Sequence, residues 1–198
     1  MNSFIYRNIH IYRILMNLIY SFKYKQRFLD IINEIQANDK TIVELCFGDI
    51  HIASECKKRD IKWMGIDLNE NFVNFALKKG FHAIKDDLIL METLPISDLC
   101  IMSGSLYHFH NDIDSILNKM MVSTQRIIIS EPVVNWSSKK GIIGKISRKH
   151  TNAGKGTESF RFDKQSMIDT LDSLKNKLNF AYSIISIKRD MIIEIKKK

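Results

Sequence analysis

The chain is poor in the residues that build disulfide frameworks, zinc sites and loop-rich architectures. Its 198 residues include only 3 cysteines, 2 prolines and 8 glycines. The cysteines Cys46, Cys56 and Cys100 are odd in number and form no C-x-x-C pair, so the sequence predicts neither a disulfide framework nor a metal site. The scarcity of proline and glycine excludes collagen-like and linker-rich architectures. We therefore expect a cytoplasmic protein with reduced thiols.

No apolar run is long enough to cross a bilayer, although residues 4–22 are rich in Ile, Leu, Tyr and Phe. Polar side chains interrupt this segment every few residues, whereas a membrane-spanning helix needs roughly 20 apolar residues. The segment also has no small-residue cleavage site of a signal peptide. We expect a packed or interfacial amphipathic helix here, which leaves a peripheral contact with a membrane open.

The chain does have enough apolar residues for a sizeable core, and an excess of positive charge. It is 45% hydrophobic and 26% charged, with a formal net charge of +8. Between residues 138 and 164, eight Lys or Arg residues and two acids give +6. The field of such a surface favours anionic partners. A long segment without periodicity is typical of a functional loop or a solvated insertion.

Strand-like and helix-like segments alternate after residue 40, which predicts βαβ units and a parallel sheet. Two more strands, joined by a tight turn, would close the sheet as an antiparallel hairpin. We expect an α/β protein with a doubly wound sheet of about seven strands, the last one antiparallel. Two helical patterns before the sheet predict an N-terminal helical cap over residues 1–38. The strands are expected at residues 41–46, 62–66, 81–85, 99–102, 126–130, 180–187 and 191–195.

The turn after the first strand carries the residues that a ligand would meet. Ligands of a doubly wound sheet bind at the carboxyl ends of its strands. The turn reads ELCFGD over residues 44–49, and Asp67 follows Gly48 by nineteen residues, at the end of the second strand. An acid at that place can accept both hydroxyls of a ribose. A nicotinamide dinucleotide site would need G-x-G-x-x-G, of which Gly48 alone is present.

This arrangement resembles the class I S-adenosylmethionine-dependent methyltransferases, over roughly residues 41–131 and more loosely the whole domain of residues 39–198. The first motif of that family is E/D-x-G-x-G-x-G, in which Cys46 and Ile50 here replace glycines. The run DLCIMSGSLYHFH (residues 98–110) is similar to the pattern that small-molecule methyltransferases carry at the fourth strand. The resemblance implies a Rossmann-like sheet, S-adenosyl-L-methionine as cofactor and a methyltransferase activity.

The same resemblance implies a set of cofactor-binding residues at the ends of four strands. Glu44 and Gly48 would lie near the methionine moiety, Asp67 on the ribose and Leu88 on the adenine ring. The full set is Glu44, Cys46, Phe47, Gly48, Asp67, Leu68, Asp86, Asp87, Leu88, Ser103, Gly104 and Tyr107.

Methyl transfer to oxygen or nitrogen requires alignment of the two reactants and the removal of one proton by a general base. An unperturbed histidine titrates near pH 6.5 and suits that role. The catalytic candidates are His108, His110 and Glu131, and the candidates for contacts with the acceptor are Tyr12, His150 and Arg161.

Missing motifs narrow the acceptor. The N/D-P-P-Y/F motif of base-amino methylases and the Pro-Cys of cytosine-carbon methylases are absent, and Ser103 stands where metal-dependent catechol-type enzymes place Asp. We therefore expect O- or N-methylation of a small anionic acceptor, such as a sugar or another metabolite, and do not favour nucleic acid. Two alternatives stay open: a non-catalytic S-adenosylmethionine-binding protein, and an RNA-directed methyltransferase that uses the basic segment.

Overall fold

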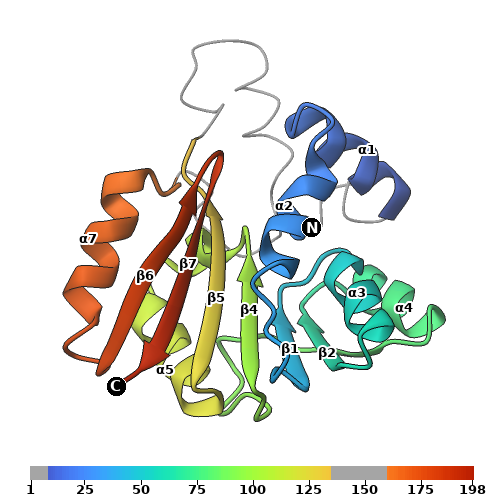
Figure 1. The fold of residues 1–198 in the computed structure, drawn as a ribbon. Helices are drawn as coiled ribbons and strands as arrows, with labels where there is room; N and C mark the ends of the chain where they lie inside the picture. Colours follow the sequence, from blue (N-terminus) through green and yellow to red (C-terminus); the bar gives the residue numbers. More distant parts are fainter. Residues whose placement is uncertain (1–8, 135–159) are drawn as a thin grey trace.

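The computed structural model describes residues 9–134 and 160–198, which form a seven-stranded sheet between two layers of helices (Figure 1). The strands are β1 (Thr41–Leu45), β2 (Lys62–Asp67), β3 (His82–Lys85), β4 (Leu99–Ser103), β5 (Arg126–Pro132), β6 (Phe180–Ile187) and β7 (Asp190–Lys197). The helices are α1 (Ile9–Ile19), α2 (Tyr24–Ile32), α3 (His51–Lys58), α4 (Glu70–Lys78), α5 (Ile113–Ser123), α7 (Lys164–Leu174) and the short 3-10 helix η2 (Leu106–Phe109).

The strand order is β3-β2-β1-β4-β5-β7-β6. Strands β1 to β5 pair in parallel, whereas β7 runs antiparallel to both β5 and β6. The predicted doubly wound sheet and its antiparallel last strand are confirmed. The last helix, α7, ends at Leu174, and a turn with Asn179 in the left-handed region follows it. No helix among the described residues combines the length and the apolar character that crossing a membrane requires.

Alternate residues of the central strands point to opposite faces of the sheet, as the pleat requires. In β4, Leu99 and Ile101 join one apolar cluster, and Cys100 and Met102 join the other. Helices α5 and α7 cover the second cluster, while α3 and α4 cover the first. The inner sides of α1 and α2 belong to the first cluster too, so these helices pack on the same layer as α3 and α4 (Figure 1).

Candidate functional site

The turn after β1 keeps the backbone conformation that glycine favours, even where glycine is missing. Cys46 has a φ of 52° and Gly48 a φ of 58°, both in the left-handed region. The Cys46 N–H donates to the carbonyl oxygen of Ile66 at 2.7 Å, which joins the turn to the end of β2. A Cβ on Gly48 would lie 3.2 Å from the hydroxyl oxygen of Tyr12, so α1 lies directly over this turn.

Asp67 ends β2 and lies against the same turn. Its Oδ2 accepts the Gly48 N–H at 3.0 Å, and its Oδ1 accepts the Asn69 N–H at 2.8 Å. Burial raises the pKa of Asp67 to about 6, although the two backbone hydrogen bonds act in the other direction. Each carboxylate oxygen keeps a second lone pair, so the group can still accept two hydroxyls.

Glu44 lies inside the molecule at the end of β1. Its side chain is fully buried, and its Oε2 accepts the indole N–H of Trp63 at 2.8 Å. Its Oε1 has no hydrogen-bond partner among the described residues. Burial raises the pKa of Glu44 well above its usual value, so the carboxyl group is held next to the turn in a state that favours a proton.

The turn after β4 meets α2. Gly104 has a φ of 62°, and its N–H donates to the carbonyl oxygen of Ser130 at 2.7 Å. A Cβ at this position would overlap Nη2 of Arg27, so the guanidinium group packs against the Gly104 backbone in the space that a side chain would fill. Arg27 is buried, and its Nε lies 3.1 Å from Oδ2 of Asp190 at the start of β7.

Four buried polar atoms gather at these strand ends without a hydrogen-bond partner in the described part of the chain. They are Nη2 of Arg27, Oγ of Ser103, Oγ of Ser130 and Oε1 of Glu131; Nε of Arg27 also lacks a hydrogen bond but lies at ion-pair distance from Asp190. Because roughly nine in ten buried polar groups of folded proteins are paired, such a group of unpaired donors and acceptors points to a polar ligand.

Glu131 contributes to this group from β5. Its Oε2 accepts the Leu106 N–H at 3.0 Å, and the side chain is almost completely buried. Burial raises the pKa of Glu131 to about 8, in spite of that hydrogen bond and of the nearby Arg27. At neutral pH its carboxyl group is therefore mostly protonated and able to donate a hydrogen bond.

The 3-10 helix after Gly104 presents an aromatic and cationic cluster. The Arg161 guanidinium carbon lies 3.8 Å from the ring centroid of Tyr107, and the Tyr107 and His108 rings are 3.9 Å apart. Burial, together with the charge of Arg161, lowers the pKa of His108 to about 4. His108 is therefore neutral at pH 7, with a lone pair for a proton. His110 instead stacks on Phe160 at 4.6 Å.

The remaining candidates have varied positions. The Phe47 ring packs on Trp63 in the core, and Leu88 is buried as well. Leu68 and Asp86 are exposed, and Asp87 is half-buried. Tyr12, a candidate for contact with the acceptor, lies next to Gly48 among the candidate cofactor residues. His150 and most of the basic segment fall outside the described residues. No group of His, Cys, Asp or Glu that could hold a metal ion exists in residues 9–134 and 160–198.

The sequence interpretation missed Arg27, although a signal was available. Arg27 occupies the buried side of α2 together with Tyr24, Phe28 and Ile31. A charged residue on the apolar stripe of a helix requires a partner or a function.

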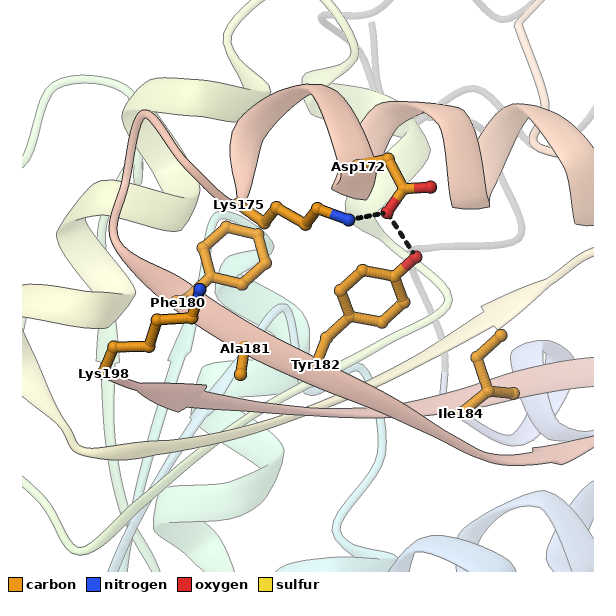
Figure 2. A pocket seen from close by; sticks show the side chains of 7 residues that line it. All are labelled: Asp172, Lys175, Phe180, Ala181, Tyr182, Ile184 and Lys198. Carbon is orange, nitrogen blue, oxygen red and sulfur yellow. Dashed lines mark hydrogen bonds and ion pairs between the residues drawn. The ribbon is translucent and has the colours of Figure 1, made fainter.

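A shallow hollow of about 500 Å³ lies elsewhere, between α7 and β6 (Figure 2). It is lined by the first residues of β6, and β6 runs parallel to β5, so it lies toward the opposite end of the sheet from Asp67 and Gly104. Its polar groups already pair with one another, because Asp172 accepts from Lys175 at 2.8 Å and from Tyr182 at 2.9 Å. We do not place the functional site there.

No model of a protein family matches the sequence, and no curated protein matches it either. Solved structures match its fold. The plantazolicin methyltransferase BpumL, solved with a monoazolic desmethylPZN analog and SAH, gives a TM-score of 0.68 at 10% identity, over 96% of this chain and 91% of that one. A possible histamine N-methyltransferase from Thermotoga maritima gives 0.66 at 16% identity, over 98% of both chains.

An O-methyltransferase family protein from Burkholderia thailandensis gives a TM-score of 0.65 at 12% identity, over 89% of this chain. The match spans only 57% of that longer protein. The chain therefore has the fold of the class I S-adenosylmethionine-dependent methyltransferases.

Proposed function

We propose that the protein is an S-adenosylmethionine-dependent methyltransferase that acts on a small anionic acceptor. The observation that carries the proposal is the group of unpaired buried polar atoms around Gly104, next to the Gly48–Asp67 hydrogen bond. S-adenosylmethionine, when bound, supplies a methyl group on a positively charged sulfur.

The residues present fit such a cofactor. Asp67 has lone pairs left for the ribose hydroxyls. Arg27 has a free Nη2 donor for a carboxylate, and the Oγ of Ser103 is a free acceptor for an ammonium group. Both lie beside Gly104, whose missing side chain makes room for the Arg27 guanidinium group.

His108 and Arg161 support a transfer reaction rather than binding alone. A neutral imidazole accepts a hydrogen bond from the hydroxyl or amine of the acceptor and orients it, although a pKa of about 4 makes His108 a weak base. Arg161 presents a planar guanidinium group next to His108, which suits a carboxylate or phosphate on the same acceptor. Glu131, protonated at neutral pH, donates a hydrogen bond from Oε1 and orients the acceptor or the cofactor.

The test is methyl transfer from labelled S-adenosylmethionine to acceptors offered in pairs, each with and without an anionic group, such as a sugar and its phosphate. We expect turnover of the anionic member. His108→Asn should lower kcat by about 100-fold, because the acceptor loses its alignment, and should leave the cofactor Kd unchanged. Arg161→Lys should raise KM for the anionic acceptor only. Lysine keeps the positive charge but cannot form the two parallel hydrogen bonds of a guanidinium group.

Two results would contradict the proposal at different levels. Tight cofactor binding without turnover of any acceptor would favour the non-catalytic binding protein. Turnover with equal KM for both members of a pair would support the methyltransferase activity but contradict the proposal that the acceptor is anionic.

A further inference from the structure

The outward side of α1 and of the turn after it carries large apolar side chains. Ile14 is 63% exposed, Leu18 56% and Phe22 79%. In α1, Ile14 and Leu18 lie four residues apart and thus on one side of the helix. Phe22 lies in the turn after the helix, where Ser21 and Phe22 both have a positive φ. The other side of the same segment is already used, because Ile9 and Tyr20 are buried in the core. We call Ile14, Leu18 and Phe22 the outer stripe.

The charge around the outer stripe has one sign. Residues 1–29 contain five Lys or Arg residues and no acid. Two of the five, Arg13 and Arg27, pair with Asp49 and Asp190 on the inner side. Lys23 and Lys25, next to Phe22, are exposed. Exposed apolar residues flanked by cations are typical of helices that lie in the interface of an anionic membrane.

We propose that the outer stripe docks on the surface of a membrane that contains anionic lipids. Ile14, Leu18 and Phe22 enter the boundary between head groups and acyl chains, while Lys23 and Lys25 lie at the lipid phosphates. A second copy of the chain is a poorer occupant, because a two-fold contact through this stripe brings like charges together.

Docking there places the candidate cofactor turn near the membrane. On the same helix, Arg13 forms two hydrogen bonds with the carboxylate of Asp49, at 2.9 and 2.7 Å, and Tyr12 lies over Gly48. The inner side of α1 thus holds the turn while the outer side faces the lipid.

The first arm of the test is sedimentation with vesicles of phosphatidylcholine alone or mixed with phosphatidylglycerol. We expect binding to the mixed vesicles that weakens as salt is added. The double variant Leu18→Ser/Phe22→Ser should bind at least tenfold less. The matched control Ile96→Ser/Val122→Ser removes side chains that are 89% and 66% exposed elsewhere, and should bind as the wild type does.

The second arm reverses charge. Lys23→Glu/Lys25→Glu should reduce binding more than tenfold, because each lysine near an anionic surface contributes a factor of about five. The control Lys62→Glu/Lys197→Glu changes exposed lysines at the start of β2 and the end of β7 and should have little effect. Circular dichroism checks that every variant folds.

Three results would overturn the proposal. One is no binding to the mixed vesicles. Another is an equal loss in both control variants. The third is a dimer in light scattering that Leu18→Ser/Phe22→Ser dissociates, which would assign the outer stripe to a second copy. None of these measurements requires cofactor or turnover, so the outcome is independent of the proposed function.

Discussion

Two buried arginines lie at opposite ends of the sheet and differ in how completely they are paired. Arg126 begins β5, at the end of the sheet where the parallel strands start. Its Nη1 donates to Asp39 at 2.7 Å, its Nε to Glu194 at 2.6 Å and its Nη2 to the carbonyl oxygen of Glu34 at 2.6 Å. Arg126 joins the segment before β1 to β5 and β7, and every nitrogen is used.

Arg27 is as inaccessible, at 8% exposure against 7% for Arg126, but it is only partly paired. Its Nε faces Asp190, while its Nη2 lies on Gly104 without a partner among the described residues. Since an unpaired buried donor costs free energy, the Nη2 of Arg27 is a candidate contact for a polar ligand. The difference indicates a structural role for Arg126, and it is the basis on which we propose that Arg27 contacts the cofactor.

The largest effect that this comparison predicts is on stability. Arg126→Met leaves the buried Asp39 without its cation and leaves Glu194 with Lys196 alone, and should lower the free energy of unfolding by about 3–5 kcal/mol. Urea denaturation measures the loss. The S-adenosylmethionine Kd of the folded protein should stay at the wild-type value, and a weaker Kd would show that the two ends of the sheet are coupled.

Arg27→Met should show the opposite balance. The loss of a charge-assisted hydrogen bond should weaken cofactor binding by about 1.5–3 kcal/mol, which raises the Kd measured by calorimetric titration about 10- to 150-fold. The unfolding free energy should fall by less than for Arg126→Met, because Tyr20 remains within 3.4 Å of Asp190. A wild-type Kd in this variant would remove Arg27 from the site.

The next effect concerns pH. Burial holds the pKa of Asp67 at about 6, and the ionised carboxylate is the form that accepts two ribose hydroxyls. As pH falls through 6, binding must first remove a proton, so the cofactor Kd should be about tenfold weaker at pH 5 than at pH 7. Asp67→Asn should bind weakly and without this pH dependence.

Asp98→Asn is the matched control for Asp67. Asp98 also accepts two backbone N–H groups, from Lys40 at 2.9 Å and Thr41 at 2.8 Å, but at the other end of the sheet. Its replacement should leave both the cofactor Kd and its pH profile unchanged. A flat wild-type profile between pH 7 and pH 5 would mean that Asp67 does not contact the cofactor.

The contrast between the two arginines also marks what the sequence could predict. Strand positions and the place of Asp67 after Gly48 follow from local patterns, because alternation of strands and helices specifies a parallel sheet and its carboxyl ends. The contact of Arg27 with Gly104 joins residues that are distant in the chain, and no local pattern specifies it.

Local sequence patterns could not predict the protonation states of the site residues either. Glu131 and His108 have ordinary residue types, and burial by the surrounding elements raises the pKa of one and lowers that of the other. Cys46 illustrates a different limit. A cysteine at a position where the family has glycine argues against a left-handed backbone there, yet Cys46 adopts that conformation. The roles of all these residues stay predictions.

The smallest expected effect is at the hollow between α7 and β6. Lys175 and Asp172 form an ion pair there, with side chains 40% and 46% exposed. Exposed pairs contribute little, because solvent screens them and two long side chains must be ordered, so Lys175→Met should change the unfolding free energy by less than about 0.5 kcal/mol. The cofactor Kd and the turnover should match the wild type. If Lys175→Met weakened cofactor binding while Arg27→Met did not, the ligand would bind in this hollow, and the unpaired atoms around Gly104 would need another explanation.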